Sequence, residues 1–174
     1  MSGFQRRSLL DSSHRFGRVV QVIGGCALLA CGLGIALDFI TANVAVEYFT
    51  VHHPQLVETA NPWLLALLWG VAAAWWAGAL GGILVSFVNE SRTQPLSPRT
   101  ILQWAEVGCV TMWCIMVLVL IGVYFAAEMV PLNSRRGTFE SDRRLMAVAM
   151  AHQYEYLLAI ISALVIAFRI WRAK

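Results

Sequence analysis

The chain has 174 residues, of which 59% are hydrophobic and 13% charged, and its formal net charge is +3. A soluble domain is near half apolar and about a quarter charged, and a protein this small cannot hide so much apolar surface from water. The composition therefore excludes a soluble globular protein, a disordered tail and a disulfide scaffold. The basic residues stand in short clusters beside apolar runs, which indicates membrane topology signals and no nucleic-acid surface.

Four apolar stretches predict four membrane-spanning helices, over about residues 18–40, 63–88, 104–130 and 145–169. The first contains nineteen residues without a charge, Val19 to Leu37. They would cover about 28 Å as a helix, close to the hydrocarbon core of about 30 Å. The apolar region of a signal peptide is about 7 to 15 residues, so we expect a retained helix and no cleaved leader. Residues 1–17 place apolar side chains among arginines and are predicted to form an amphipathic cytoplasmic segment.

The other three stretches differ in how clearly they are bounded. Asn61 and Pro62 are a typical helix start for the second, and Pro98 precedes the third. The fourth is less uniform, because its cleanest part, Leu157 to Phe168, would reach only about 18 Å. It must include the residues before Leu157 to span, and a helix starting near Asp142 with Ser141 as N-cap would be long enough.

The distribution of basic residues predicts the orientation. With the N-terminus inside, the cytoplasmic segments hold nine basic residues and the outer segments hold four. The positive-inside rule then favours both termini in the cytoplasm. We therefore expect an all-α, integral membrane four-helix bundle, N-in and C-in, with residues 1–174 forming one transmembrane domain.

Small residues recur every four positions on the first two helices. They form one stripe on the first and two adjacent stripes on the second: Cys26, Ala30 and Gly34; Ala73, Ala77 and Gly81; and Ala74, Gly78 and Gly82. Small residues at this spacing let helix backbones approach closely in lipid. The stripes predict helix contacts, although glycine is also common in membrane helices for other reasons.

The stretch from Asp38 to Gly82 carries a recognisable pattern. It contains Asp-x-x-Thr at residues 38–41, Glu-Tyr-Phe-Thr at 47–50, and Trp-Gly at 69–70. This resembles an uncharacterised family of small bacterial four-helix integral membrane proteins, over about a quarter of the chain. The resemblance implies a location in the bacterial inner (plasma) membrane and draws attention to Asp38 and Glu47. It implies no activity and transfers no catalytic residue.

Ionisable residues within a predicted span are the candidate functional groups, because a charge in the bilayer is costly. His152 and Glu155 are three apart on the fourth helix and share one face, which Tyr156 continues. The hypothesis is an outward-facing polar pocket that holds a divalent metal ion or passes protons. Its candidate metal ligands are Glu128, His152, Glu155, Glu47 and His52, and its further polar lining is Asp38, Tyr124 and Tyr156.

Structural interpretations of the same residues remain open. Asp38 and Glu128 stand where a membrane helix meets water, where acids are common, and Glu155 could pair with an arginine of the last outer loop. His52 and His53 are adjacent and would point in opposite directions on an extended segment.

No enzyme motif is found in the sequence. The interpretation that the sequence favours is a non-enzymatic subunit of a membrane assembly, with a membrane protein or a second copy of the chain as partner. The alternative is an ion or proton transport component, or a metal-binding protein, that uses the Glu/His cluster.

Overall fold

The computed structural model describes residues 3–54, 56–126 and 139–173, and this part of the chain contains helices and no strand. The helices are α1 (Gly3–Val44), α2 (Glu47–Thr50), α3 (Pro62–Glu90), α4 (Pro98–Ala126) and α5 (Phe139–Arg172). Four of them are long and apolar enough to cross a membrane, over residues 12–44, 62–90, 98–126 and 143–172. The predicted all-helical class with four apolar helices is confirmed.

The helix ends follow the sequence signals in part. At the start of α3, the side chain of Asn61 accepts hydrogen bonds from the backbone N–H groups of Trp63 and Leu64, as predicted. Helix α5 begins at Phe139, so Ser141 lies inside the helix and the predicted N-cap there is wrong. Helix α1 is continuous from Gly3, so the segment predicted over residues 1–17 runs directly into the first long helix.

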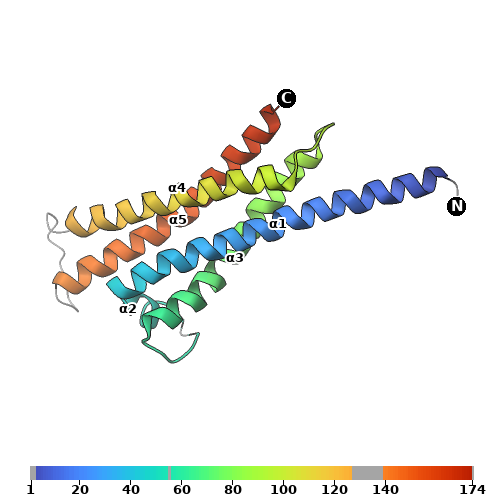
Figure 1. The fold of residues 1–174 in the computed structure, drawn as a ribbon. Coiled ribbons are helices and arrows are strands. Elements are labelled where there is room, and N and C mark those ends of the chain that lie inside the picture. Colours follow the sequence, from blue (N-terminus) through green and yellow to red (C-terminus); the bar gives the residue numbers. More distant parts are fainter. Residues whose placement is uncertain (1–2, 55, 127–138, 174) are drawn as a thin grey trace.

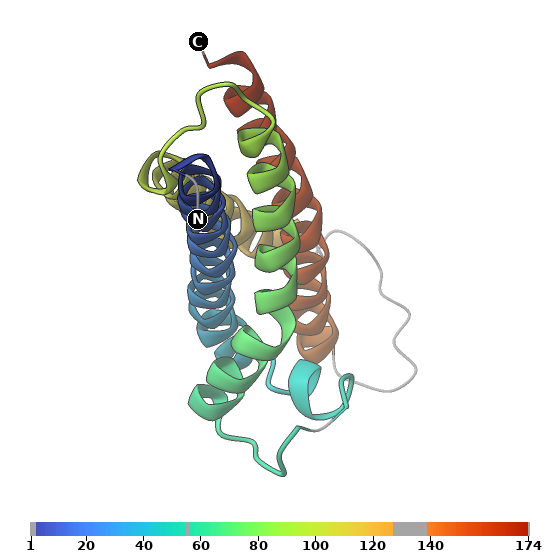
Figure 2. The same ribbon diagram turned by 90° about the vertical axis from the view of Figure 1, so that its right-hand side faces the viewer.

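The four long helices form a bundle in which each packs mainly on two neighbours (Figures 1 and 2). Helix α1 packs most extensively on α3 and also on α4, while α5 packs on both α4 and α3. The chain termini lie at one end of the bundle, and the short helix α2 lies at the other (Figure 1). The C-terminal end of α1 and the N-terminal half of α5 thus meet near α2, which contacts both helices.

Small residues bring α1 and α3 into backbone contact. A Cβ atom placed on Gly34 would lie 2.6 Å from the carbonyl oxygen of Gly70, and one on Gly78 would lie 2.5 Å from the carbonyl oxygen of Cys26. The predicted stripes therefore make contacts. Gly34 and Cys26 of α1 pack on the face of α3 that carries Gly70, Ala74 and Gly78. Gly81, on the adjacent stripe, faces Ala163 of α5 at 3.6 Å instead.

The outward surface of the bundle is apolar. Each long helix exposes large hydrophobic side chains, for example Leu28 (75%), Phe87 (74%), Leu118 (67%) and Ile160 (60%). A water-soluble protein rarely exposes continuous apolar surface of this kind. The side chains inside include small residues and methionines, such as Ala74, Met112 and Met116.

The close contact of α1 with α3 predicts a difference between two glycines. Gly70→Ala should destabilise the protein by about 1–3 kcal/mol, because the new Cβ would overlap the backbone of Ile35. Gly32→Ala is the matched control, since its Cβ would meet nothing within 4 Å, and it should leave stability unchanged or raise it by up to about 1 kcal/mol. Thermal unfolding in detergent, followed by circular dichroism, measures both. Equal stability of the two variants would contradict the backbone contact.

Candidate functional site

Three ionisable side chains of α1 and α5 meet near the α2 end of the bundle. His152 Nε2 lies 3.4 Å from Asp38 Oδ1, and His152 Nδ1 lies 3.5 Å from Glu155 Oε2. All three side chains are mostly enclosed, with exposed side-chain fractions of 4% for Asp38, 12% for His152 and 13% for Glu155. One imidazole is therefore held between two carboxyl groups that approach its opposite nitrogens.

Thr41 fixes which imidazole nitrogen carries a hydrogen. Its hydroxyl donates to the backbone oxygen of Leu37 at 3.2 Å and lies 3.3 Å from His152 Nε2. A hydroxyl has one hydrogen, so with that hydrogen committed to Leu37 it accepts from Nε2, and we assign Nε2 as protonated.

The assignment leaves Nδ1 facing Glu155. A neutral imidazole with its hydrogen on Nε2 has a lone pair at Nδ1, which would repel an ionised carboxylate oxygen 3.5 Å away. A proton on either His152 Nδ1 or Glu155 removes this repulsion. The geometry thus creates a place for one exchangeable proton between the two side chains.

Aromatic side chains of the first connection, the segment between α1 and α3 over residues 45–61, cover the imidazole. The ring of Tyr48 stacks on His152, with centroids 4.8 Å apart and an interplanar angle of 9°, and Phe49 approaches it edge-on at 5.8 Å. His53 Nδ1 donates to the backbone oxygen of Tyr48 at 2.9 Å, and the His53 ring lies edge-on to that of Trp69, with ring centroids 5.1 Å apart. This cover separates His152 from the adjacent end of the bundle.

The geometry does not favour the metal site expected from the sequence. Asp38 and Glu155 approach opposite nitrogens of one ring. A metal ion bound to either nitrogen would therefore have only one of the two carboxylates beside it. Among the described residues, no group of three or more His, Cys, Asp or Glu side chains is arranged to hold a metal ion. Glu128, one predicted ligand, lies outside those residues.

The remaining predicted site residues lie in different surroundings. Glu47 is half-buried at the start of α2. His52 is exposed, and it is the adjacent His53 that contacts the aromatic rings.

The two predicted tyrosines each contact a neighbouring helix. Tyr124 accepts a hydrogen bond from Arg143 at 2.8 Å and lies 4.1 Å beneath its guanidinium group. Tyr156 stacks on Trp76 of α3, with ring centroids 5.8 Å apart.

Sequence reasoning missed Thr41, Tyr48 and His53 as members of the site. The signal for Thr41 was its spacing: Asp38 and Thr41 are three apart on α1, just as His152 and Glu155 are on α5. Two such pairs on facing helices place four polar groups at one level. No local pattern indicated that α2 and its following turn fold back onto His152.

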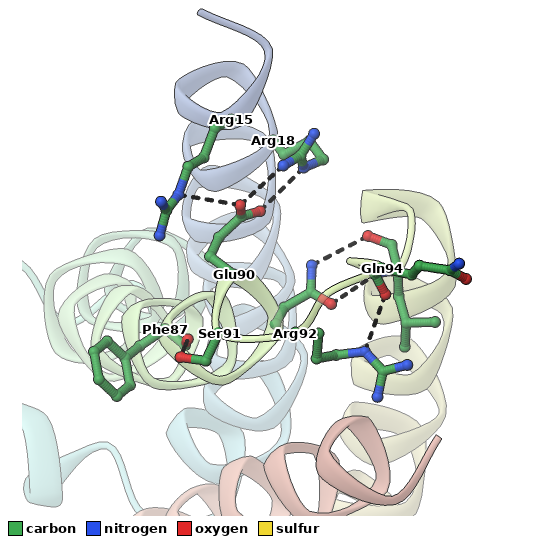
Figure 3. A network of polar contacts seen from close by, with 9 residues as sticks. Arg15, Arg18, Phe87, Glu90, Ser91, Arg92 and Gln94 are labelled. Carbon is green, nitrogen blue, oxygen red and sulfur yellow. Dashed lines mark hydrogen bonds and ion pairs between the residues drawn. The ribbon is translucent and has the colours of Figure 1, made fainter. Parts of the chain in front are cut away.

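A second polar cluster lies at the opposite end of the bundle (Figure 3). Glu90 of α3, whose side chain is 7% exposed, receives two hydrogen bonds from Arg18 of α1, at 3.0 and 2.9 Å, and pairs with Arg15 at 3.3 Å. Arg92 donates to the backbone oxygens of Ile170 and Ala173 at the end of α5. These contacts tie α1, α3 and α5 together and concentrate basic residues at this end.

Comparison of the chain with protein-family models, with curated proteins and with solved structures finds no match. The resemblance noted in the sequence stays a prediction, and the functional argument depends on the geometry of the site.

The position of Tyr48 predicts how stability depends on alkaline pH. Burial, and then the nearby Tyr156, Asp38 and Glu155, raise the pKa of the Tyr48 phenol from 10.0 to about 12. The folded protein therefore holds this proton more tightly than the unfolded chain. The resulting stabilisation is complete below about pH 10 and is lost as the pH rises towards 12.

The unfolding temperature of the wild type in detergent should accordingly decrease between pH 10 and 12. The unfolding temperature of Tyr48→Phe should decrease less over the same range. Tyr154→Phe, a change at a more exposed tyrosine of α5, is the control and should retain the full decrease. An equal decrease in wild type and Tyr48→Phe would show that Tyr48 is not responsible.

Proposed function

We propose that the protein is a multi-pass protein of the bacterial inner membrane and that its site binds and exchanges protons as part of ion or proton transport. The four long apolar helices with apolar outer surfaces support the membrane assignment. In this arrangement Glu155 lies about 18 Å along α5 from Arg143 and about 26 Å from Arg172, within the span.

The orientation we propose has both termini in the cytoplasm. Its support is the cluster of Arg15, Arg18 and Arg92 at the end of the bundle where the termini lie, since cytoplasmic ends of membrane helices are rich in arginine and lysine. Arg169, whose guanidinium group lies 4.5 Å from the ring centre of Trp104, adds to the same end. The Asp38–His152–Glu155 site is then nearer the outer surface.

The observation that carries the functional proposal is the placement of His152 between Asp38 and Glu155. Ionisable side chains inside a membrane bundle are costly and commonly form proton relays. Three acid–base groups at these separations are placed to exchange protons with one another. A proton entering at one carboxyl group can therefore leave at the other, with the imidazole passing it between its two nitrogens.

This geometry favours the transport alternative over a purely structural subunit. A packing subunit needs apolar and small-residue contacts, which α1 and α3 supply where Gly34 meets Gly70 and Gly78 meets Cys26. The three buried acid–base side chains add desolvation cost to the fold. Membership of a larger assembly remains compatible with the proposal, because a proton-binding subunit can work beside a partner.

The test is proton flux into vesicles that contain the purified protein and an internal pH-sensitive dye. With a potassium diffusion potential as driving force, we expect flux from the wild type and a decrease of about 100-fold in Glu155→Gln and His152→Ala, since a positioned proton-transfer group contributes at least this much. Glu106→Gln, which changes an exposed carboxylate on α4, should behave as the wild type.

A second measurement observes the proton directly. The ring nitrogens of His152 should titrate in nitrogen-15 NMR spectra of the protein in micelles, and Asp38→Asn and Glu155→Gln should each shift that titration. Unchanged titration and unchanged flux in both variants would refute the proposal.

A further inference from the structure

A narrow cavity inside the bundle leads away from Glu155. It has a volume of about 90 Å³ and is lined by all four long helices, mostly with small and apolar side chains. Glu155 is the only acidic or basic residue among its lining residues, and Ser162 lies further along the same helix. Cys26 of α1 and Cys109 of α4 both line the cavity.

A second hollow, of about 330 Å³, lies between α3 and α5 beside this cavity. The two share five lining residues: Ala77, Gly81, Tyr156, Ala159 and Ala163. The hollow is bordered by the stacked rings of Trp76 and Tyr156, which are 42% and 37% exposed. In the proposed membrane arrangement, these partly exposed rings face the bilayer. Glu155, next to Tyr156 in the chain, lines the adjoining cavity and not the hollow itself.

The charges at the site are unbalanced. Two carboxyl groups, Asp38 and Glu155, face one imidazole, so with both carboxyl groups ionised the site is negative by one charge even when His152 is a cation. Among the described residues, the titratable groups that face the site or line the cavity come from α1, α2, the turn after α2, α4 and α5: Asp38, Cys26, Tyr48, His53, Cys109, His152, Glu155 and Tyr156. None of these is a lysine or an arginine. An uncompensated charge among apolar helices is costly, and a proton or another cation must balance it.

We propose that the hollow between α3 and α5 binds an apolar organic cation, which enters from the bilayer and replaces the proton at Glu155. The inference rests on the proposed function, because the exchanged proton is the one held between His152 and Glu155. A ligand pocket that is mainly apolar with one charged group suits such a molecule. The rings of Trp76 and Tyr156 offer apolar and aromatic contact to the organic part of such a cation.

The sizes of the two spaces indicate how the ligand fits. An apolar cavity of about 150 Å³ holds benzene, so the 90 Å³ cavity is too small for an aromatic ring and the 330 Å³ hollow is large enough. The apolar part of the ligand would therefore lie against Trp76 and Tyr156, with its charged group directed towards Glu155. The exchange is balanced: the protonated site and the free cation give the occupied site and one proton.

The experiment uses benzyltrimethylammonium as the probe, with neopentylbenzene as the neutral molecule of the same shape. Binding to the purified full-length protein in detergent is measured by calorimetry, and released protons by a dye in weak buffer. We expect the wild type to bind the cation with release of about one proton, and Glu155→Gln to weaken its binding by about tenfold or more. The neutral probe should release no proton on binding.

Gly81→Val tests the path without touching an acid–base group. Gly81 lines both spaces, and a Cβ placed there would lie 3.6 Å from Ala163, an ordinary contact, so the larger side chain narrows the passage. It should weaken cation binding while the NMR titration of His152 stays as in the wild type. Gly32→Ala, on the far face of α1, is the matched control and should bind normally.

The outcomes separate this inference from the proposed function. If His152 titrates and Glu155→Gln shifts that titration, but the wild type does not bind the cation or binds it as tightly as Glu155→Gln does, the site handles protons alone and the inference is overturned. Equal binding of the neutral probe would identify a merely apolar hollow and would overturn it also. If Asp38→Asn and Glu155→Gln both leave the titration of His152 and the proton flux unchanged, the proposed function itself fails.

Discussion

The cost of placing carboxyl groups among apolar helices is the constraint on which the site depends. Asp38 is 3% exposed, and the polar groups at its level are Thr41 of its own helix and His152 and Glu155 of α5. Its compensation comes from His152 on α5, whose other nitrogen then requires a proton shared with Glu155. The hydroxyl of Thr41 and the stacked ring of Tyr48 hold the imidazole in the orientation that this arrangement needs.

The number and type of the helices could be predicted from the sequence because a run of about twenty apolar residues has few alternatives to a helix. His152 and Glu155 could be found for the same reason, since ionisable side chains stand out in an apolar run. The small-residue stripes also predicted a real contact, in which Gly34 approaches the backbone of Gly70. These features depend on local composition and on the helical period.

The rest of the site depends on tertiary packing, which a single sequence does not contain. Asp38 could equally have been an acid at a membrane surface, and it is buried because α5 and the first connection cover the end of α1. His53 is enclosed and His52 is exposed because of the turn that follows α2. A single sequence also does not indicate on which side of the His152 ring each carboxyl group lies. The structure places them on opposite sides, which differs from the convergent metal ligands that we expected.

The backbone contact between α1 and α3 determines which parts of the molecule are able to move. Where Gly70 and Gly78 meet α1, only small side chains such as Ala30 lie beside the two backbones, so tilting or sliding either helix would bring main-chain atoms into collision. The bidentate pair of Arg18 with Glu90 clamps the same two helices a second time. The α1–α3 pair thus forms a tightly packed frame that carries Asp38, and any displacement of α5 against it would change the 3.4 Å separation of Asp38 Oδ1 and His152 Nε2.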